Sequence, residues 1–60
     1  MTITVEYHGS MLAEHGTYTA TADPRYAGRL YLTPIDPGGR AIRNANPESV
    51  TLVSVEGFVA

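Results

Sequence analysis

The chain has 60 residues, no cysteine and a formal net charge of −2, with four arginines and no lysine. This length predicts a single domain over residues 1–60 with a small core. The absence of cysteine excludes disulfides and cysteine-rich zinc sites as sources of stability. Because 43% of the residues are hydrophobic, we expect a folded chain and not a disordered one.

Two observations bear on the compartment of the protein. No stretch approaches the roughly 20 apolar residues that a membrane span requires. Residues 1–7 lack both the basic segment and the apolar segment of a signal peptide. We therefore expect a soluble, cytoplasmic protein.

Residues 2–7 alternate between apolar and polar side chains. This period of two is typical of a strand with one buried face and one face in water. Ile3, Val5 and Tyr7 are expected to point inward, toward the core.

Residues 8–16 interrupt this pattern and predict a long loop. Gly9 and Gly16 stand too close together for more than one helical turn between them. We expect the loop to fold back over the sheet, with Met11 or Leu12 closing one open end of the core.

The second strand is predicted at residues 17–22, where the alternation returns. This pattern places Tyr18, Ala20 and Ala22 on the inner face. Residues 23–28 are rich in turn-forming types and are expected to connect this strand to the next.

The third strand is predicted at residues 29–35. Leu30 and Leu32 are expected to point inward, and Tyr31 outward. Because strands with one solvated face place alternate residues on opposite sides, Tyr31 is expected to be accessible to a partner.

A tight hairpin is predicted at Asp36-Pro37-Gly38-Gly39. Proline fixes the φ angle that the first central position of a turn requires, and the two glycines are able to adopt the positive φ that closes it. Residues 40–44 are then expected to pair back onto the preceding strand, with Ile42 directed inward.

Residues 46–49, Asn-Pro-Glu-Ser, predict a single 3₁₀ turn, because asparagine is a good cap and proline suits the first position of a turn. Residues 50–55 predict the last strand. Its apolar positions change phase at Leu52 and Val53, which indicates either a β-bulge or burial on both faces.

This order of strands and loops resembles an SH3-like small barrel, the fold of SH3, Tudor-type and KOW-type domains. The resemblance covers nearly the whole chain as a pattern. Residues 8–16 match the long first loop of that fold, residues 36–39 its distal hairpin, and residues 46–49 the 3₁₀ turn before its final strand. The resemblance implies an all-β, five-stranded barrel with a partly open end.

A narrower resemblance rests on residues 7–9 (Tyr-His-Gly), 28–33 (Gly-Arg-Leu-Tyr-Leu-Thr) and 47–51 (Pro-Glu-Ser-Val-Thr). These stretches look like segments of small uncharacterised proteins of actinobacteria and their phages. A phage origin implies that the protein binds or modulates a host bacterial protein. The chain has no tryptophan and no Ala-Leu-Tyr-Asp-Tyr stretch, so the proline-rich ligands of peptide-binding SH3 domains are not expected.

We do not expect an enzyme. Two of the three serines are accounted for by the 3₁₀ turn and the last strand, and a barrel of this size lacks room for a substrate pocket of about 300 Å³. Glu6, His8, Glu14 and His15 are the only cluster of metal-ligand types, and the histidines lack the short fixed spacing of a zinc motif. No metal or cofactor is therefore expected.

The strongest candidates for a binding surface are arginines and tyrosines in the middle of the chain: Arg25, Tyr26, Arg29, Tyr31 and Arg43. These residue types are enriched at the energetic centres of protein interfaces. We therefore expect a small non-catalytic protein–protein interaction module, either a monomer or a homodimer. One alternative is a plain solvated sheet face. Another is weak nucleic-acid binding by stacking and charge, which the net charge of −2 disfavours.

A second candidate surface is apolar and lies near the C-terminus: Val53, Val55, Phe58 and Val59. If Val53 and Val55 face away from the core, they form an apolar edge of the kind that mediates dimer contacts. A self-associating structural protein is therefore the third functional interpretation. The alternative is that the C-terminal tail folds back and covers the open end of the barrel.

Overall fold

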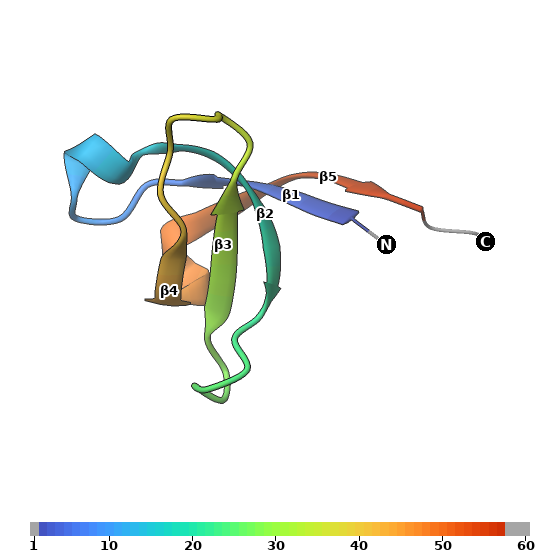
Figure 1. Cartoon of the computed structure of the whole chain (residues 1–60). Helices are drawn as coiled ribbons and strands as arrows, with labels where there is room; N and C mark the ends of the chain where they lie inside the picture. The colour runs from blue at the N-terminus through green and yellow to red at the C-terminus, as the bar shows by residue number, and fades with distance from the viewer. Residues whose placement is uncertain (1, 58–60) are drawn as a thin grey trace.

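The computed structural model describes residues 2–57 (Figure 1). In chain order the elements are β1 (Thr2–Tyr7), η1 (Leu12–Glu14), β2 (Gly16–Ala22), β3 (Leu30–Pro34), β4 (Ile42–Ala45), η2 (Pro47–Ser49) and β5 (Val50–Glu56). The η elements are 3₁₀ turns, so the expected all-β class is confirmed. Within the same residues, no helix has the length and apolarity to cross a membrane.

The strands form one antiparallel sheet in the order β4-β3-β2-β1-β5. β2 is shared between two halves of this sheet, because residues 16–20 pair with β1 and residues 18–22 pair with β3. Figure 1 shows β2 curving, so that β3 and β4 run across the direction of β1 and β5. β4 and β5 are the two edges, and over residues 2–57 the sheet does not close into a barrel.

The core is a cluster of buried side chains from four strands: Val5, Tyr18, Ala20, Leu32, Ile42 and Ala45. Partly buried apolar side chains pack against it: Ile3, Tyr7, Leu30 and Val50. The predicted inner faces of β1 and β3 are therefore confirmed. The expectation for Ala22 is wrong, because this residue ends β2 where the chain leaves the sheet, and it is exposed.

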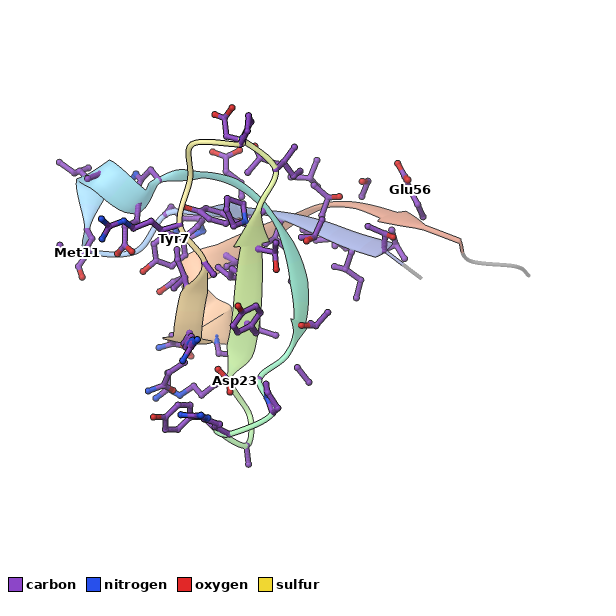
Figure 2. All side chains as sticks on the ribbon, in the orientation of Figure 1. Tyr7, Met11, Asp23 and Glu56 are labelled. Carbon is purple, nitrogen blue, oxygen red and sulfur yellow. The ribbon has the colours of Figure 1, made fainter. Side chains whose placement is uncertain are left out.

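The long first loop is present between β1 and β2, and it contains η1. Met11 and Leu12 remain 59% and 80% exposed, and Figure 2 shows Met11 at the tip of the loop, away from the sheet. The expectation that one of them closes the core is therefore wrong. Tyr7 and Tyr18 occupy that end instead, with ring centroids 6.2 Å apart in an edge-to-face arrangement.

The predicted β-bulge is present in β5. Thr4 pairs with Ser54, and the next residue of β1, Val5, pairs with Leu52. Val53 is therefore the extra residue, which explains the change of apolar phase in the sequence. Burial on both faces is excluded as the explanation, because Leu52 and Val53 are both exposed.

The predicted turn is present between β3 and β4, but the expected tight hairpin is wrong, because β3 ends at Pro34 and pairing resumes only at Ile42. The carbonyl oxygen of Asp36 accepts a hydrogen bond from the N–H of Gly39 at 3.0 Å, as in a β-turn closed from its first to its fourth residue. The expectation of positive φ at Gly38 and Gly39 is wrong, because neither adopts it. Gly39 is needed for space instead: a Cβ there would lie 2.6 Å from the Cβ of Pro34.

The predicted 3₁₀ turn before the last strand is confirmed as η2. The side chain of Asn46 accepts a hydrogen bond of 3.0 Å from the N–H of Glu48, and Pro47 stands at the first position. The carbonyl oxygen of Ser49 accepts a hydrogen bond of 2.8 Å from the N–H of His8. This last bond joins the end of η2 to the start of the long first loop.

Candidate functional site

The loop between β2 and β3 is organised by one carboxylate. Asp23 is buried, and among residues 2–57 it is the only charged residue that is buried. Its Oδ1 accepts hydrogen bonds from the N–H groups of Arg25 at 2.8 Å and Tyr26 at 3.3 Å. Its Oδ2 accepts one from the N–H of Asn44 at 2.8 Å. One side chain therefore holds the backbone of its own loop and the backbone of β4.

Two backbone hydrogen bonds complete the same loop. The N–H of Asp23 donates to the carbonyl of Arg29 at 3.0 Å, and the N–H of Arg29 donates to the carbonyl of Tyr26 at 3.1 Å. Gly28 supplies the positive φ of 75° that this tight path requires. The loop backbone is therefore fixed, while the side chains of Arg25, Tyr26 and Arg29 are exposed.

A bulge in β4 allows this strand to contact the loop between β2 and β3. Leu30 pairs with Ala45 and Leu32 pairs with Ile42, so β4 holds one residue more than β3 over this interval. Asn44 lies within it at a φ of 56°, a conformation that asparagine tolerates better than most residues. The bulge leaves the N–H of Asn44 free to reach Asp23.

These contacts lower the pKa of the Asp23 carboxyl below its ordinary value of 3.8. The hydrogen bond from the Asn44 N–H is the largest cause, followed by the bond from the Arg25 N–H. Burial opposes the shift, and the bond from Tyr26 and the positive charge of Arg43 add to it. Asp23 is therefore ionised at neutral pH, and its charge is stabilised mainly by backbone donors.

A small pocket of about 160 Å³ opens beside this carboxylate, lined by Asp23, Pro24, Arg25, Tyr31 and Arg43. Figure 2 shows nitrogen-tipped side chains gathered near the labelled Asp23, at the end of the sheet opposite the β3–β4 hairpin. The structure thus brings together Arg25, Tyr31 and Arg43 from the predicted surface. Tyr31 is half-buried there, so its outward position is only partly accessible.

The other two predicted residues lie in the same loop but do not line the pocket. Tyr26 is 46% exposed, and Arg29 is exposed beside the loop closure. We call the five residues together the basic aromatic end: Arg25, Tyr26, Arg29, Tyr31 and Arg43. Sequence reasoning missed Asp23, although an aspartate that opens a turn commonly binds the backbone two residues on.

A larger open groove of about 720 Å³ lies between the first loop and the β3–β4 hairpin. Its walls are formed by Ala13, His15, Gly16, Thr17, Tyr18, Pro34, Ile35, Asp36, Gly38 and Gly39. The expectation that this fold lacks room for a pocket of about 300 Å³ is therefore wrong. The hydroxyl of Tyr18 in this groove already donates to the carbonyl oxygen of Glu14 at 2.6 Å.

The residues of metal-ligand type near the first loop make separate contacts. Nε2 of His8 and Oγ1 of Thr51 are hydrogen-bonded at 3.0 Å. Nε2 of His15 donates to the carbonyl oxygen of Gly9 at 2.6 Å. Among residues 2–57, no three histidine or acidic side chains lie close enough together to hold a metal ion.

The second predicted surface lies along β5. Val53 and Val55 are exposed, and Leu52, which was not among the predicted surface residues, is 61% exposed. The free edge of β5 therefore carries apolar side chains. Phe58 and Val59 lie outside the described residues, and so does the predicted return of the C-terminal tail.

Comparison with known proteins gives no relative for this arrangement. No protein family, no curated protein and no solved structure matches the chain.

Proposed function

We propose that this chain is a small non-catalytic protein–protein interaction module, and that it binds its partner through the basic aromatic end. The pocket beside Asp23 carries this proposal, because it brings Arg25, Tyr31 and Arg43 from three elements to one place. Arginine and tyrosine are common among residues that dominate interface energies.

The fixed loop supports a binding role. Ordering loops and side chains on association costs free energy, and a surface that is already ordered avoids part of that cost. Here the backbone of residues 23–29 is held by Asp23 and by its own hydrogen bonds before any partner arrives. The exposed Tyr26 and Arg29 extend the contact area beyond the pocket.

We also propose an SH3-like fold and a phage origin for this chain. The strand order, the long first loop and the 3₁₀ turn before β5 support an SH3-like fold. The short stretches that resemble proteins of actinobacteria and their phages support a phage protein that acts on a host bacterial protein in the cytoplasm. A protein partner fits the net charge of −2 better than a phosphate backbone does.

The test is affinity capture from actinobacterial lysate with the tagged chain, with and without nuclease. Arg43→Gln is compared with Arg40→Gln, which removes an arginine from the hairpin at the opposite end of β3 (Figure 1). We expect a protein that survives nuclease, is lost with Arg43→Gln and is retained with Arg40→Gln. Equal capture by both variants, or capture that requires nucleic acid, would contradict the proposal.

A second candidate function is self-association through β5. One observation favours it: β5 is an edge strand of seven residues, and Leu52, Val53 and Val55 on it are exposed. Natural proteins commonly protect such edges with charged residues or proline, and the charged residue of β5 is Glu56 at its C-terminal end, beyond the apolar positions.

A further inference from the structure

We propose that the pocket between Arg25 and Arg43 binds a single side-chain carboxylate, an aspartate or glutamate that the protein partner presents. This inference rests on the proposed function, because it specifies the partner chemistry at the same surface.

The charges favour an incoming anion. Arg25 and Arg43 line the pocket together with the carboxylate of Asp23. That carboxylate is already hydrogen-bonded to three backbone N–H groups. Among residues 2–57, no side-chain hydrogen bond involves either guanidinium. Each guanidinium carries a fork of donors whose geometry matches a carboxylate.

The size of the pocket favours one side chain. Its volume of about 160 Å³ is well below the roughly 300 Å³ at which small-molecule sites begin. The pocket therefore suits the end of one side chain. Pro24 and Tyr31 add apolar atoms to the lining, which suit the methylene groups of an aspartate or glutamate.

The balance of charge favours a carboxylate over a phosphate backbone. Asp23 contributes a negative charge at the pocket, which disfavours a doubly charged ligand more than a singly charged one. The whole chain carries a net charge of −2, and strong binding to nucleic acid depends on neutralising several phosphates at once. A single acidic side chain among neutral neighbours carries one negative charge, so Asp23 and the net negative charge of the chain repel it less than they repel a phosphate backbone.

The experiment is an NMR titration of the ¹⁵N-labelled 60-residue protein with two short capped peptides. One is acetyl-Gly-Tyr-Glu-Tyr-Gly-amide, and the other has glutamine in place of glutamate. We expect saturable shifts at the amides of Arg25, Tyr31 and Arg43 with the glutamate peptide, and binding about tenfold weaker with the glutamine peptide. Arg43→Gln should weaken glutamate-peptide binding to a similar degree, whereas Arg40→Gln should leave it unchanged.

Equal binding of the two peptides, shifts confined to another surface, or no shifts at millimolar peptide would overturn the carboxylate pocket. So would a short oligothymidylate that shifts the same amides at lower concentration than the glutamate peptide. The two proposals fail separately. A partner whose capture depends on Arg43, combined with equal peptide binding, leaves the interaction surface standing and removes the carboxylate. A clear preference for the glutamate peptide without Arg43-dependent capture would support the carboxylate pocket and contradict the proposed interaction surface.

Discussion

The N–H of Asn44 donates a hydrogen bond of 2.8 Å to Oδ2 of Asp23, and this bond joins the loop after β2 to strand β4 across 21 positions of the sequence. The other oxygen of the same carboxylate holds the backbone of the loop. Asp23 therefore sets the shape of the loop and its position against β4 together. The arginines of the pocket stand on both sides of this connection, on the loop and on β4.

Asp23→Asn should destabilise the protein. The side-chain amide has one oxygen in place of two, so it cannot accept from the N–H of Asn44 and from the loop N–H groups together. We expect the melting temperature at neutral pH to fall by roughly 5 °C or more, as for a lost network of buried hydrogen bonds in a small domain. Thermal unfolding followed by circular dichroism measures this effect, and Asp36→Asn in the exposed hairpin turn is the matched control.

The contribution of Asp23 should depend on pH with a known sign. Its folded pKa lies below the ordinary value of 3.8, so its stabilising effect is complete above that value and is lost as the pH falls through the folded pKa. We expect the stability difference between the parent and Asp23→Asn to shrink as the pH falls below about 4. A difference that stays constant from neutral pH to strongly acidic pH would show that the charge of Asp23 has no stabilising role.

Tyr18→Phe should separate the contribution of the Tyr18 hydrogen bond to stability from the contribution of its ring packing. The Tyr18 hydroxyl donates to the carbonyl of Glu14 while its ring is buried beside Tyr7. Removing the hydroxyl should cost about 1 kcal/mol at neutral pH, measured by chemical denaturation. An unchanged stability would contradict the assigned bond.

The same variant should also change the alkaline limb of the stability profile. Burial, followed by the charge of Glu14, raises the pKa of Tyr18 above 10.0. The neutral form is therefore favoured in the folded state, and this stability is present below pH 10 and lost as the pH rises through the raised pKa. We expect stability above pH 10 to fall less steeply in Tyr18→Phe than in the parent; an equally steep fall would count against a buried neutral Tyr18.

Two neighbouring glycines should respond in opposite ways to alanine. A Cβ at Gly39 would lie 2.6 Å from the Cβ of Pro34, whereas a Cβ at Gly38 would meet nothing within 4 Å. We expect Gly39→Ala to destabilise the protein by about 1–3 kcal/mol through overpacking. Gly38→Ala should be neutral or stabilising by up to about 1 kcal/mol, because it restricts the unfolded chain. Equal effects in thermal or chemical unfolding would argue against this hairpin geometry.

The free edge of β5 provides the test of self-association. If β5 pairs with β5 of a second copy, sedimentation should give a mass above the 6.4 kDa of one chain. Val53→Lys should then restore the monomer, because it places a charge on the exposed bulge of this edge. Thr33→Lys, at an exposed position of β3, is the control and should leave the mass unchanged. A parent that is monomeric at all concentrations would exclude this function.

The features that sequence reasoning predicted correctly are local ones. The alternation of residues 2–7 depends on neighbours in the chain, and so does the capping of η2 by Asn46. The phase change at Leu52 and Val53 predicted either a β-bulge or burial on both faces, and the bulge at Val53 is the one that the structure shows. In each case the physical cause lies within a few residues of its effect.

The features that it missed depend on distant parts of the chain. The bond between Asp23 and Asn44 requires the bulge in β4, which leaves no apolar signature. Met11 was expected in the core because it is apolar, but the tyrosines of β1 and β2 already fill that end. The role of Gly39 depends on how close the hairpin brings it to Pro34, which composition does not reveal.

The most direct test of the interaction surface is site-specific photo-crosslinking in bacterial cells. A benzophenone amino acid replaces Tyr26 in one variant and Ile35 in another; these side chains are 46% and 56% exposed and lie at opposite ends of β3. We predict a covalent adduct with one protein partner from position 26 and none from position 35. An adduct from position 35 alone, or from neither position, would contradict the assignment of the basic aromatic end as the binding surface.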